Sequence, residues 1–243
     1  MKLTEKQIAD IRAHALDEYP RECCGIIEHG QYMPLANSHQ TPESDFTIDL
    51  SVWAEHEIEA VVHSHPDATD EPTAADIAGQ IETAVPWVLC SVKSSEVSRP
   101  YSWGGDYTPP LIGREFRHGP SGTDDKGDCY ALIKDWYKLE RNIELPEFPR
   151  DDEWWKKGGD LYEHGFAEAG FMDLGVTVAP EAGDVVLMAI NSTKNNHAAI
   201  YLGDGMILHH LHGRLSRREP ACLWRKMYKR WIRHENDNPP WAA

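Results

Sequence analysis

Two histidines separated by one residue end an apolar run of the chain. His63 and His65 belong to the stretch Ala-Val-Val-His-Ser-His over 60–65, which predicts a β-strand whose alternation places both imidazoles on one face. Asp76 lies three residues after Thr73, the expected N-cap of the next helix. Two imidazoles and one carboxylate leave a fourth position for water, which is the composition of a catalytic zinc site. This spacing therefore predicts a zinc centre.

Such a centre also needs a group that accepts a proton from zinc-bound water. Glu22, at the head of a strand expected over 23–27, is the candidate base. The spacing of the two histidines and the aspartate, with Glu-Cys-Cys-Gly upstream, resembles the JAMM (JAB/MPN) metallopeptidases over about residues 1–105. The resemblance implies that Glu22 activates the water and that zinc is bound by His63, His65 and Asp76. Thr73 stands where that family usually has serine, and it keeps the hydroxyl.

A cysteine at an expected helix start is the second candidate for chemistry. Cys129 opens a stretch over 129–141 in which apolar residues recur at helical spacing. The positive end of a helix favours a thiolate, and a cysteine nucleophile needs a base and a group that orients the base. His197 begins a predicted strand, and His209 follows it across a hairpin expected at 203–205. Pairing of the two strands would bring these histidines side by side.

These residues resemble the NlpC-type papain-like cysteine peptidases over about residues 115–235, together with Gly-Asp-Val-Val-Leu before the first histidine strand. The resemblance implies cleavage of peptide bonds in bacterial peptidoglycan, with Cys129 as nucleophile, His197 as base and His209 as the orienting group. Tyr130 departs from the small serine that many members carry after the cysteine.

The sequence does not decide which residue orients the base. His210 and His212 compete with His209 by proximity. Strand alternation would place His209 on one face and the other two histidines on the opposite face. The register needed to decide between them is only inferred.

The helices and strands expected along the chain indicate an α+β fold in two domains. Thr4 and Gln7 form an expected capping box for a helix that ends at Pro20, and Ser51 is the expected cap of a helix to about Glu59. The remaining expected strands cover 46–50, 86–93, 97–103, 183–188, 197–202 and 206–210, and residues 142–180 are expected to be helix and loop. The breaker-rich stretch over 104–110 predicts a boundary between a JAMM-type mixed sheet flanked by helices, 1–108, and a papain-like NlpC-type domain, 109–243.

Composition narrows the class of protein. With 24 Lys and Arg against 40 Asp and Glu, the net charge of −16 argues against binding of nucleic acid. The basic stretch over 214–233 is interpreted as a solvated strand face. Five unevenly spaced cysteines favour reduced thiols, and neither a signal peptide nor insertion into a membrane is expected.

The succession of the two domain types resembles the tail tip assembly proteins of lambda-like tailed phages. That resemblance implies other tail tip proteins and peptidoglycan peptides as partners. It also implies a location in the host cytoplasm during assembly, then in the virion tail tip, and at the periplasm on infection. Two alternatives remain: an assembly protein with silent catalytic sites, and a host-type peptidase that acts on the cell wall or on isopeptide bonds.

Overall fold

A computed structural model describes residues 1–237 of the protein. Its internal contacts divide the chain into two compact units. The first consists of Met1–Thr108 with 122–124, and the second of Pro109–Ser121 and the chain from Asp125 onward. Residues 122–124 belong to the first unit because the Thr123 amide donates to the Ser102 carbonyl at 2.9 Å.

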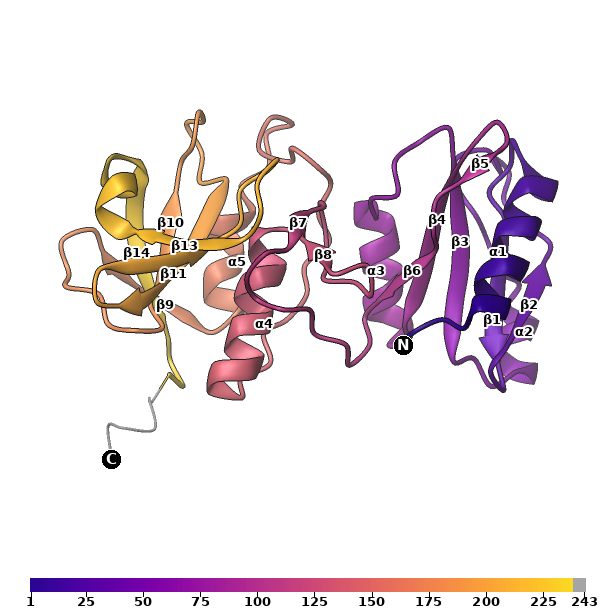
Figure 1. The fold of residues 1–243 in the computed structure, drawn as a ribbon, viewed down its shortest axis with the longest axis horizontal. Coiled ribbons are helices and arrows are strands. Elements are labelled where there is room, and N and C mark those ends of the chain that lie inside the picture. Colours follow the sequence, from indigo (N-terminus) through magenta and orange to yellow (C-terminus); the bar gives the residue numbers. More distant parts are fainter. Residues whose placement is uncertain (238–243) are drawn as a thin grey trace. The chain divides into compact units, whose positions relative to one another are not determined.

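The first unit is a six-stranded mixed sheet with helices on its faces (Figure 1). Along the sheet the order is β2-β1-β3-β4-β5, with β6 also paired to β4, and only the β3–β4 pair is parallel. The strands are β1 (Cys24–Glu28), β2 (Gln31–Leu35), β3 (Ala60–Pro66), β4 (Trp87–Lys93), β5 (Glu96–Val97) and β6 (Tyr101–Trp103). The helices are α1 (Glu5–Glu18), α2 (Leu50–Glu55) and α3 (Ala74–Thr83).

The two long helices of this unit begin where the sequence predicts. Thr4 and Gln7 form the expected capping box of α1, and Thr73 and Asp76 form one at α3. Helix α1 packs Ile11 and Ala15 onto the sheet face that carries Val62, Val88 and Cys90. The opposite face carries Val61, Trp87, Leu89, Tyr101 and Trp103. His63 and His65 share that opposite face with Val61, because residues two apart on a strand point the same way.

Several expectations for the first unit are wrong. Residues 46–49 form no strand: Phe46 and Ile48 pack against the core without joining a strand ladder. Helix α2 is capped by Asp49 instead of Ser51, since the Asp49 carboxylate accepts the Ser51 amide at 2.8 Å, and the helix ends at Glu55.

The expected strand over 97–103 is two strands, β5 and β6, interrupted around Pro100, a residue with no N–H to donate to a ladder. Strand β2, at the edge of the sheet, was not expected from the sequence. No residue of this strand is fully buried, and Pro34 lies within it.

The second unit contains a six-stranded antiparallel sheet in the order β13-β12-β11-β10-β14-β9 (Figure 1). Its strands are β9 (Phe171–Gly175), β10 (Val185–Met188), β11 (His197–Gly203), β12 (Met206–His209), β13 (Arg217–Pro220) and β14 (Tyr228–His234), and a separate short pair joins β7 (Glu115–Phe116) to β8 (Lys126–Gly127). The helices are α4 (Cys129–Arg141), α5 (Leu161–Glu168) and the 3-10 helix η1 (Ala221–Met227). The hairpin between β11 and β12 is confirmed, and its Gly203 and Gly205 have positive φ angles of 86° and 75°.

Each face of this sheet has its own core. Helix α4 packs Leu132, Ile133 and Trp136 onto the face that carries Val185, Leu187 and Ile200. The other face carries Val186, Met188 and Ile207, and Trp224 from η1 packs against it. Leu139, which the helical spacing assigned to the buried side of α4, is 55% exposed. Strand β9 lies within the stretch expected to be helix and loop, and its exposed Met172 and Asp173 hide the strand pattern.

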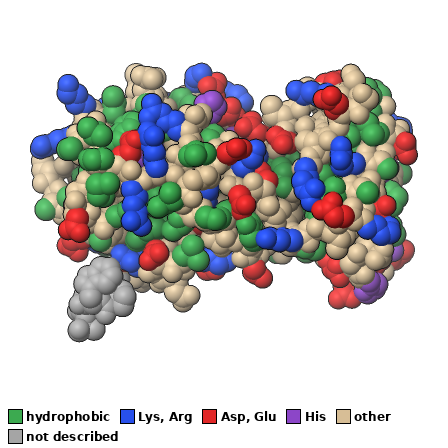
Figure 2. All heavy atoms as spheres, in the orientation of Figure 1, with side chains coloured by type: hydrophobic (Ala, Val, Ile, Leu, Met, Phe, Trp, Pro, Cys, Tyr) green, Lys and Arg blue, Asp and Glu red, His purple; other side chains and the backbone are tan. Residues whose placement is uncertain are grey.

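Charge on the second unit is dispersed. Figure 2 shows basic side chains scattered among acidic and apolar ones on the face in view. In the basic stretch, Arg230 and Arg233 pair with Asp173 and Asp184 at 2.7 Å, whereas Arg217 and Arg218 on β13 are exposed. No helix among the described residues has both the length and the apolar character needed to cross a membrane.

Candidate metal centre and candidate thiol site

The first unit brings His63, His65 and Asp76 together. The ligand atoms of the three residues lie within 4.8 Å of one another, and all three residues are buried. His63 Nε2 is 3.1 Å from Asp76 Oδ1, and His65 Nε2 is 3.3 Å from Asp76 Oδ2. Strand β3 supplies the two imidazoles, and the first turn of α3 supplies the carboxylate.

Local hydrogen bonds orient each of these side chains. Asp76 Oδ2 accepts the Thr73 amide and the Thr73 hydroxyl, each at 2.8 Å, so the capping box fixes the carboxylate. His65 Nδ1 lies 3.0 Å from the Thr69 carbonyl oxygen. A carbonyl can only accept, so His65 Nδ1 carries the hydrogen and the lone pair of Nε2 points toward the cluster.

The chemistry of the cluster fits a divalent cation. Both ring nitrogens of His63 are buried without a hydrogen-bond partner in the described chain, although Nε2 lies close to Asp76. Donors about 2.0–2.2 Å from a tetrahedral zinc are separated by about 3.3–3.6 Å, slightly more than the 3.1 and 3.3 Å found here. Burial lowers the pKa of His63. Although burial opposes it, interaction with His63 and His65 holds the pKa of Asp76 well below its usual range.

Glu22 lies beside the cluster, where the chain enters β1. Cys24 on that strand is paired with His63 on β3, and the Cys23 amide donates to Ser64 Oγ at 2.9 Å. Burial, the largest cause, raises the pKa of Glu22 to about 7, with His65 opposing and Asp76 adding to the rise. A carboxyl with a pKa near neutrality is suited to proton transfer.

Aromatic rings enclose the His63 side of the cluster. Phe46 stacks on the His63 imidazole with ring centres 4.8 Å apart, and Trp87 and Trp103 meet the same ring edge-on. The sequence did not indicate this role for Phe46, because a strand was expected over residues 46–50. The rings reduce the access of water to one side of the imidazole.

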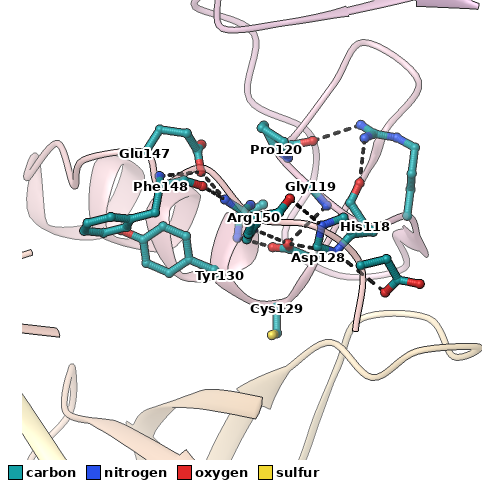
Figure 3. Close-up of polar contacts among 12 residues, drawn as sticks. His118, Gly119, Pro120, Asp128, Cys129, Tyr130, Glu147, Phe148 and Arg150 are labelled. Atoms are coloured by element: carbon teal, nitrogen blue, oxygen red, sulfur yellow. Dashed lines mark hydrogen bonds and ion pairs between the residues drawn. The ribbon is translucent and has the colours of Figure 1, made fainter. Parts of the chain in front are cut away.

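In the second unit, Cys129 is the first residue of α4. Its neighbour Asp128 caps the helix: Oδ1 accepts the Ala131 amide at 2.8 Å, and Oδ2 accepts Arg150 Nε at 2.7 Å and the Gly119 amide at 3.1 Å. Figure 3 shows the Cys129 sulfur directed away from this polar cluster. These hydrogen bonds fix the start of α4, and the thiol lies on the other side, where it faces a pocket.

The thiol is neutral at rest, contrary to what a helix N-terminus alone favours. Burial, followed by the charge of Asp128, raises the pKa of Cys129 to about 11. Its Sγ lies 3.1 Å from the Tyr162 hydroxyl of α5. Among the described residues, Tyr162 is the side-chain hydrogen-bond partner of the thiol, and His197 is not.

A pocket of about 530 Å³ lies between the thiol and His197. Cys129, Tyr162 and His197 all line it. His197 Nε2 lies 3.2 Å from His209 Nδ1. Burial lowers the pKa of both histidines, so this pair is also neutral at rest.

The register separates the three candidate histidines. Strand β12 ends at His209, whose Cα partner on β11 is Ala199, so His209 lies diagonally next to His197. His210 is buried with its ring against Phe116, and His212 is exposed beside the same ring. His209 is therefore the hydrogen-bond partner of His197.

Sequence reasoning missed two further contacts of this site. Tyr162 comes from the segment without a clear periodic pattern. Glu219 on β13 has Oε2 at 3.1 Å from His209 Nε2, and Trp224 Nε1 donates to the same oxygen at 2.7 Å. The alternation of Arg-Arg-Glu-Pro is compatible with a strand, but only the pairing of β13 with β12 reveals the neighbour of Glu219.

Family models match both units. The model of the NlpC/P60 family matches residues 98–233, and that of prokaryotic homologs of the JAB domain matches residues 4–103. The tail tip assembly protein K of Escherichia phage N15 is 33% identical over 96% of both chains. The protein of the same name from Escherichia phage lambda is 39% identical over 70% of this chain and 78% of its own.

Among solved structures, the NlpC/P60 domain of the peptidoglycan hydrolase SagA is similar. It is 15% identical, covering 50% of this chain and 88% of that chain, with a TM-score of 0.35.

Proposed function

Because the chain belongs to the tail tip assembly protein K family and carries an NlpC/P60 domain, we propose that its second unit hydrolyses peptide bonds of bacterial peptidoglycan. Cys129 is the nucleophile, His197 the base and His209 the group that orients the base. One observation carries the proposal: Cys129 lines the same pocket as His197, which is hydrogen-bonded to His209. In this proposal the protein both takes part in tail assembly and opens the cell wall locally.

The proposed reaction starts from a neutral thiol. Since the Nε2 atom of His197 is engaged with His209, Nδ1 is left to accept the thiol proton. Sulfur attacks the scissile carbonyl carbon, the amine leaves with the proton held by His197, and a thioester forms. Water then hydrolyses the thioester after losing a proton to the same imidazole, which restores the thiol.

We further propose that the first unit is a zinc peptidase site. His63, His65 and Asp76 would hold the ion, which when bound polarises a carbonyl and acidifies water. Glu22 would accept and return the proton, and the Thr73 hydroxyl would keep Asp76 in place. The orphaned His63 nitrogens support a metal at this cluster.

Metal analysis tests the zinc site. We expect about one zinc per chain in the wild-type protein and a large loss in His63→Ala. The exposed His212 in the second unit provides a matched control, so His212→Ala should keep its zinc. Equal zinc in all three proteins would contradict the assignment.

The partners proposed for the chain are other tail tip proteins and peptidoglycan peptides. The protein would act in the host cytoplasm during assembly and at the tail tip on infection, where it reaches the periplasm. Phage carrying Cys129→Ala tests this assignment. We expect intact tails that contain the variant and have lost wall digestion, whereas intact tails with full wall digestion would indicate a silent thiol site. Absence of the wild-type chain from tail assembly intermediates and tails would instead favour a host-type peptidase.

A further inference from the structure

A carboxylate lies at the far end of the histidine pair. Glu219 Oε2 is 3.1 Å from His209 Nε2 and accepts a hydrogen bond from Trp224 Nε1 at 2.7 Å. The Arg217 guanidinium contacts the other carboxylate oxygen, Oε1. The Glu219 side chain is 15% exposed, whereas that of His209 is 1% exposed, so the contact between them is shielded from water.

The pairing of the strands explains why His197, His209 and Glu219 lie in a row. Strands β11, β12 and β13 are neighbours in the sheet (Figure 1). Ala199 is the Cα partner of His209, and Ile207 is that of Glu219. Directly paired residues share a sheet face, as do residues two apart on one strand. His197, His209 and Glu219 therefore occupy one face, on a diagonal line across three strands.

The hydrogen-bonding capacity of each group determines which atom donates and which accepts along the row Glu219, His209 and His197. An ionised carboxylate can only accept, so His209 Nε2 carries a hydrogen and, in the neutral ring, Nδ1 accepts. His197 Nε2 must then donate to His209, which leaves His197 Nδ1 with a lone pair. That lone pair is what the thiol proton requires.

We propose that Glu219 is a positioning residue of the thiol site, which fixes the tautomers of both histidines and directs the basic nitrogen of His197 toward the nucleophile. This inference rests on the proposed roles of Cys129 and His197. Glu219 does not touch the thiol and does not itself line the pocket, although its hydrogen-bond partner Trp224 does. It acts on the thiol site through His209.

Electrostatics support the same role. Burial disfavours ionisation of Glu219, yet the Trp224 hydrogen bond and the neighbouring His209 and Arg217 hold its pKa below the ordinary value. Burial lowers the pKa of His209, while Glu219 raises it and Arg217 and Arg214 lower it. Among these groups, Glu219 supplies the negative charge that favours the protonated imidazole. Burial, followed by the neighbouring His209 and His210, lowers the pKa of His197.

The wild-type protein provides the first test. Nitrogen-15 NMR of the imidazoles distinguishes the two neutral tautomers of each ring. We expect His209 and His197 both to carry hydrogen on Nε2 near neutral pH. Hydrogen on Nδ1 of His209 would overturn the proposal without any substitution.

Glu219→Gln provides the second test, because it keeps the shape of the side chain and removes its charge. The NMR titration midpoint of His209 should fall by about one pH unit. His197 takes the thiol proton, so the alkylation rate depends on the lone pair of its Nδ1. If the two tautomers of the histidine pair become equally populated without the Glu219 charge, the fraction of molecules with that lone pair falls to about half, so alkylation of Cys129 by iodoacetamide should slow about twofold or more. The alkylation is measured in a Cys222→Ser background, because Cys222 is the exposed cysteine.

Two further variants complete the design. Glu219→Asp keeps the charge and should recover part of the alkylation rate. Arg218→Gln alters an exposed residue of the same strand and should alkylate at the wild-type rate. An unchanged midpoint or an unchanged alkylation rate in Glu219→Gln would overturn the proposal, as would equal slowing in the Arg218 control.

Neither readout uses peptidoglycan, so the two proposals fail separately. If the wild-type protein cleaves no peptidoglycan while the midpoint and alkylation respond as expected, the proposed function fails and the role of Glu219 in thiol activation stands. If peptidoglycan is cleaved and Glu219→Gln behaves as wild type in both measurements, the positioning role fails alone.

Discussion

Replacement of Arg150 by methionine should strongly destabilise the second unit. Arg150 Nε binds Asp128 Oδ2 at 2.7 Å, and Nη1 contacts Glu147 and donates to the Phe148 carbonyl at 2.8 Å (Figure 3). The Arg150 side chain is 5% exposed, so its loss leaves two buried carboxylates without their shared cation. Removal of one partner from a buried pair costs about 3–5 kcal/mol.

This cost predicts a large change in melting temperature. At about 3 °C per kcal/mol for a unit of this size, the transition of the second unit should fall by about 10 °C. Differential scanning calorimetry of Arg150→Met measures the fall, and Arg218→Met, at an exposed arginine, should melt within about 1 °C of wild type. Glu147 keeps its ion pair with Lys134 at 2.7 Å, so the charge left without its cation is that of Asp128. The double variant Arg150→Met with Asp128→Asn should therefore recover part of the loss, since that charge is removed. If Arg150→Met melts at the same temperature as the control, the cluster does not stabilise the start of α4.

Four other outcomes follow from the two sites. Glu22→Gln should retain zinc but lose metallopeptidase activity on any substrate found for the first unit, because an amide cannot accept the water proton; loss of zinc would contradict its role as base. His209→Ala should keep measurable peptidoglycan cleavage while His197→Ala loses nearly all of it, since the first only misplaces the base; equal losses would argue against this division. A chelator should remove zinc without stopping that cleavage, because the thiol reaction uses no metal. The pKa values of Asp128 and Glu147 are held below their ordinary values by Arg150 against burial, so the free energy of unfolding should be highest above the unfolded-state values near about 4 and should decrease as the pH falls below them, which acid titration of stability measures.

Features determined by neighbouring residues could be predicted from the sequence. The capping boxes at Thr4 and Thr73 place two helix starts correctly, because an N-cap satisfies amides within the next turn. The alternation around His63 likewise predicts the strand that brings two imidazoles to one face. The spacing of the glycines after β11 predicts the hairpin that brings His197 and His209 together.

Features that depend on contacts between residues far apart in the chain could not be predicted from the sequence. The contact between Glu219 and His209 requires the register of β13 against β12, which no local pattern specifies. Tyr162 reaches the thiol from a segment whose helix has no buried residue, so it lacks the apolar periodicity that reveals α4. The segment beginning at Phe46 has the composition of a strand, but the Phe46 ring stacks on the His63 imidazole and the segment does not join a sheet.

Mass spectrometry of purified peptidoglycan after incubation with the protein shows directly whether the thiol site cleaves stem peptides. We expect new fragments whose masses correspond to hydrolysis of a peptide bond in the stem peptide, formed by the wild-type protein and absent with Cys129→Ala at matched folding. Fragments from cleavage of the glycan, or the same peptide fragments with Cys129→Ala, would show that Cys129 is not the nucleophile of a peptidoglycan peptidase.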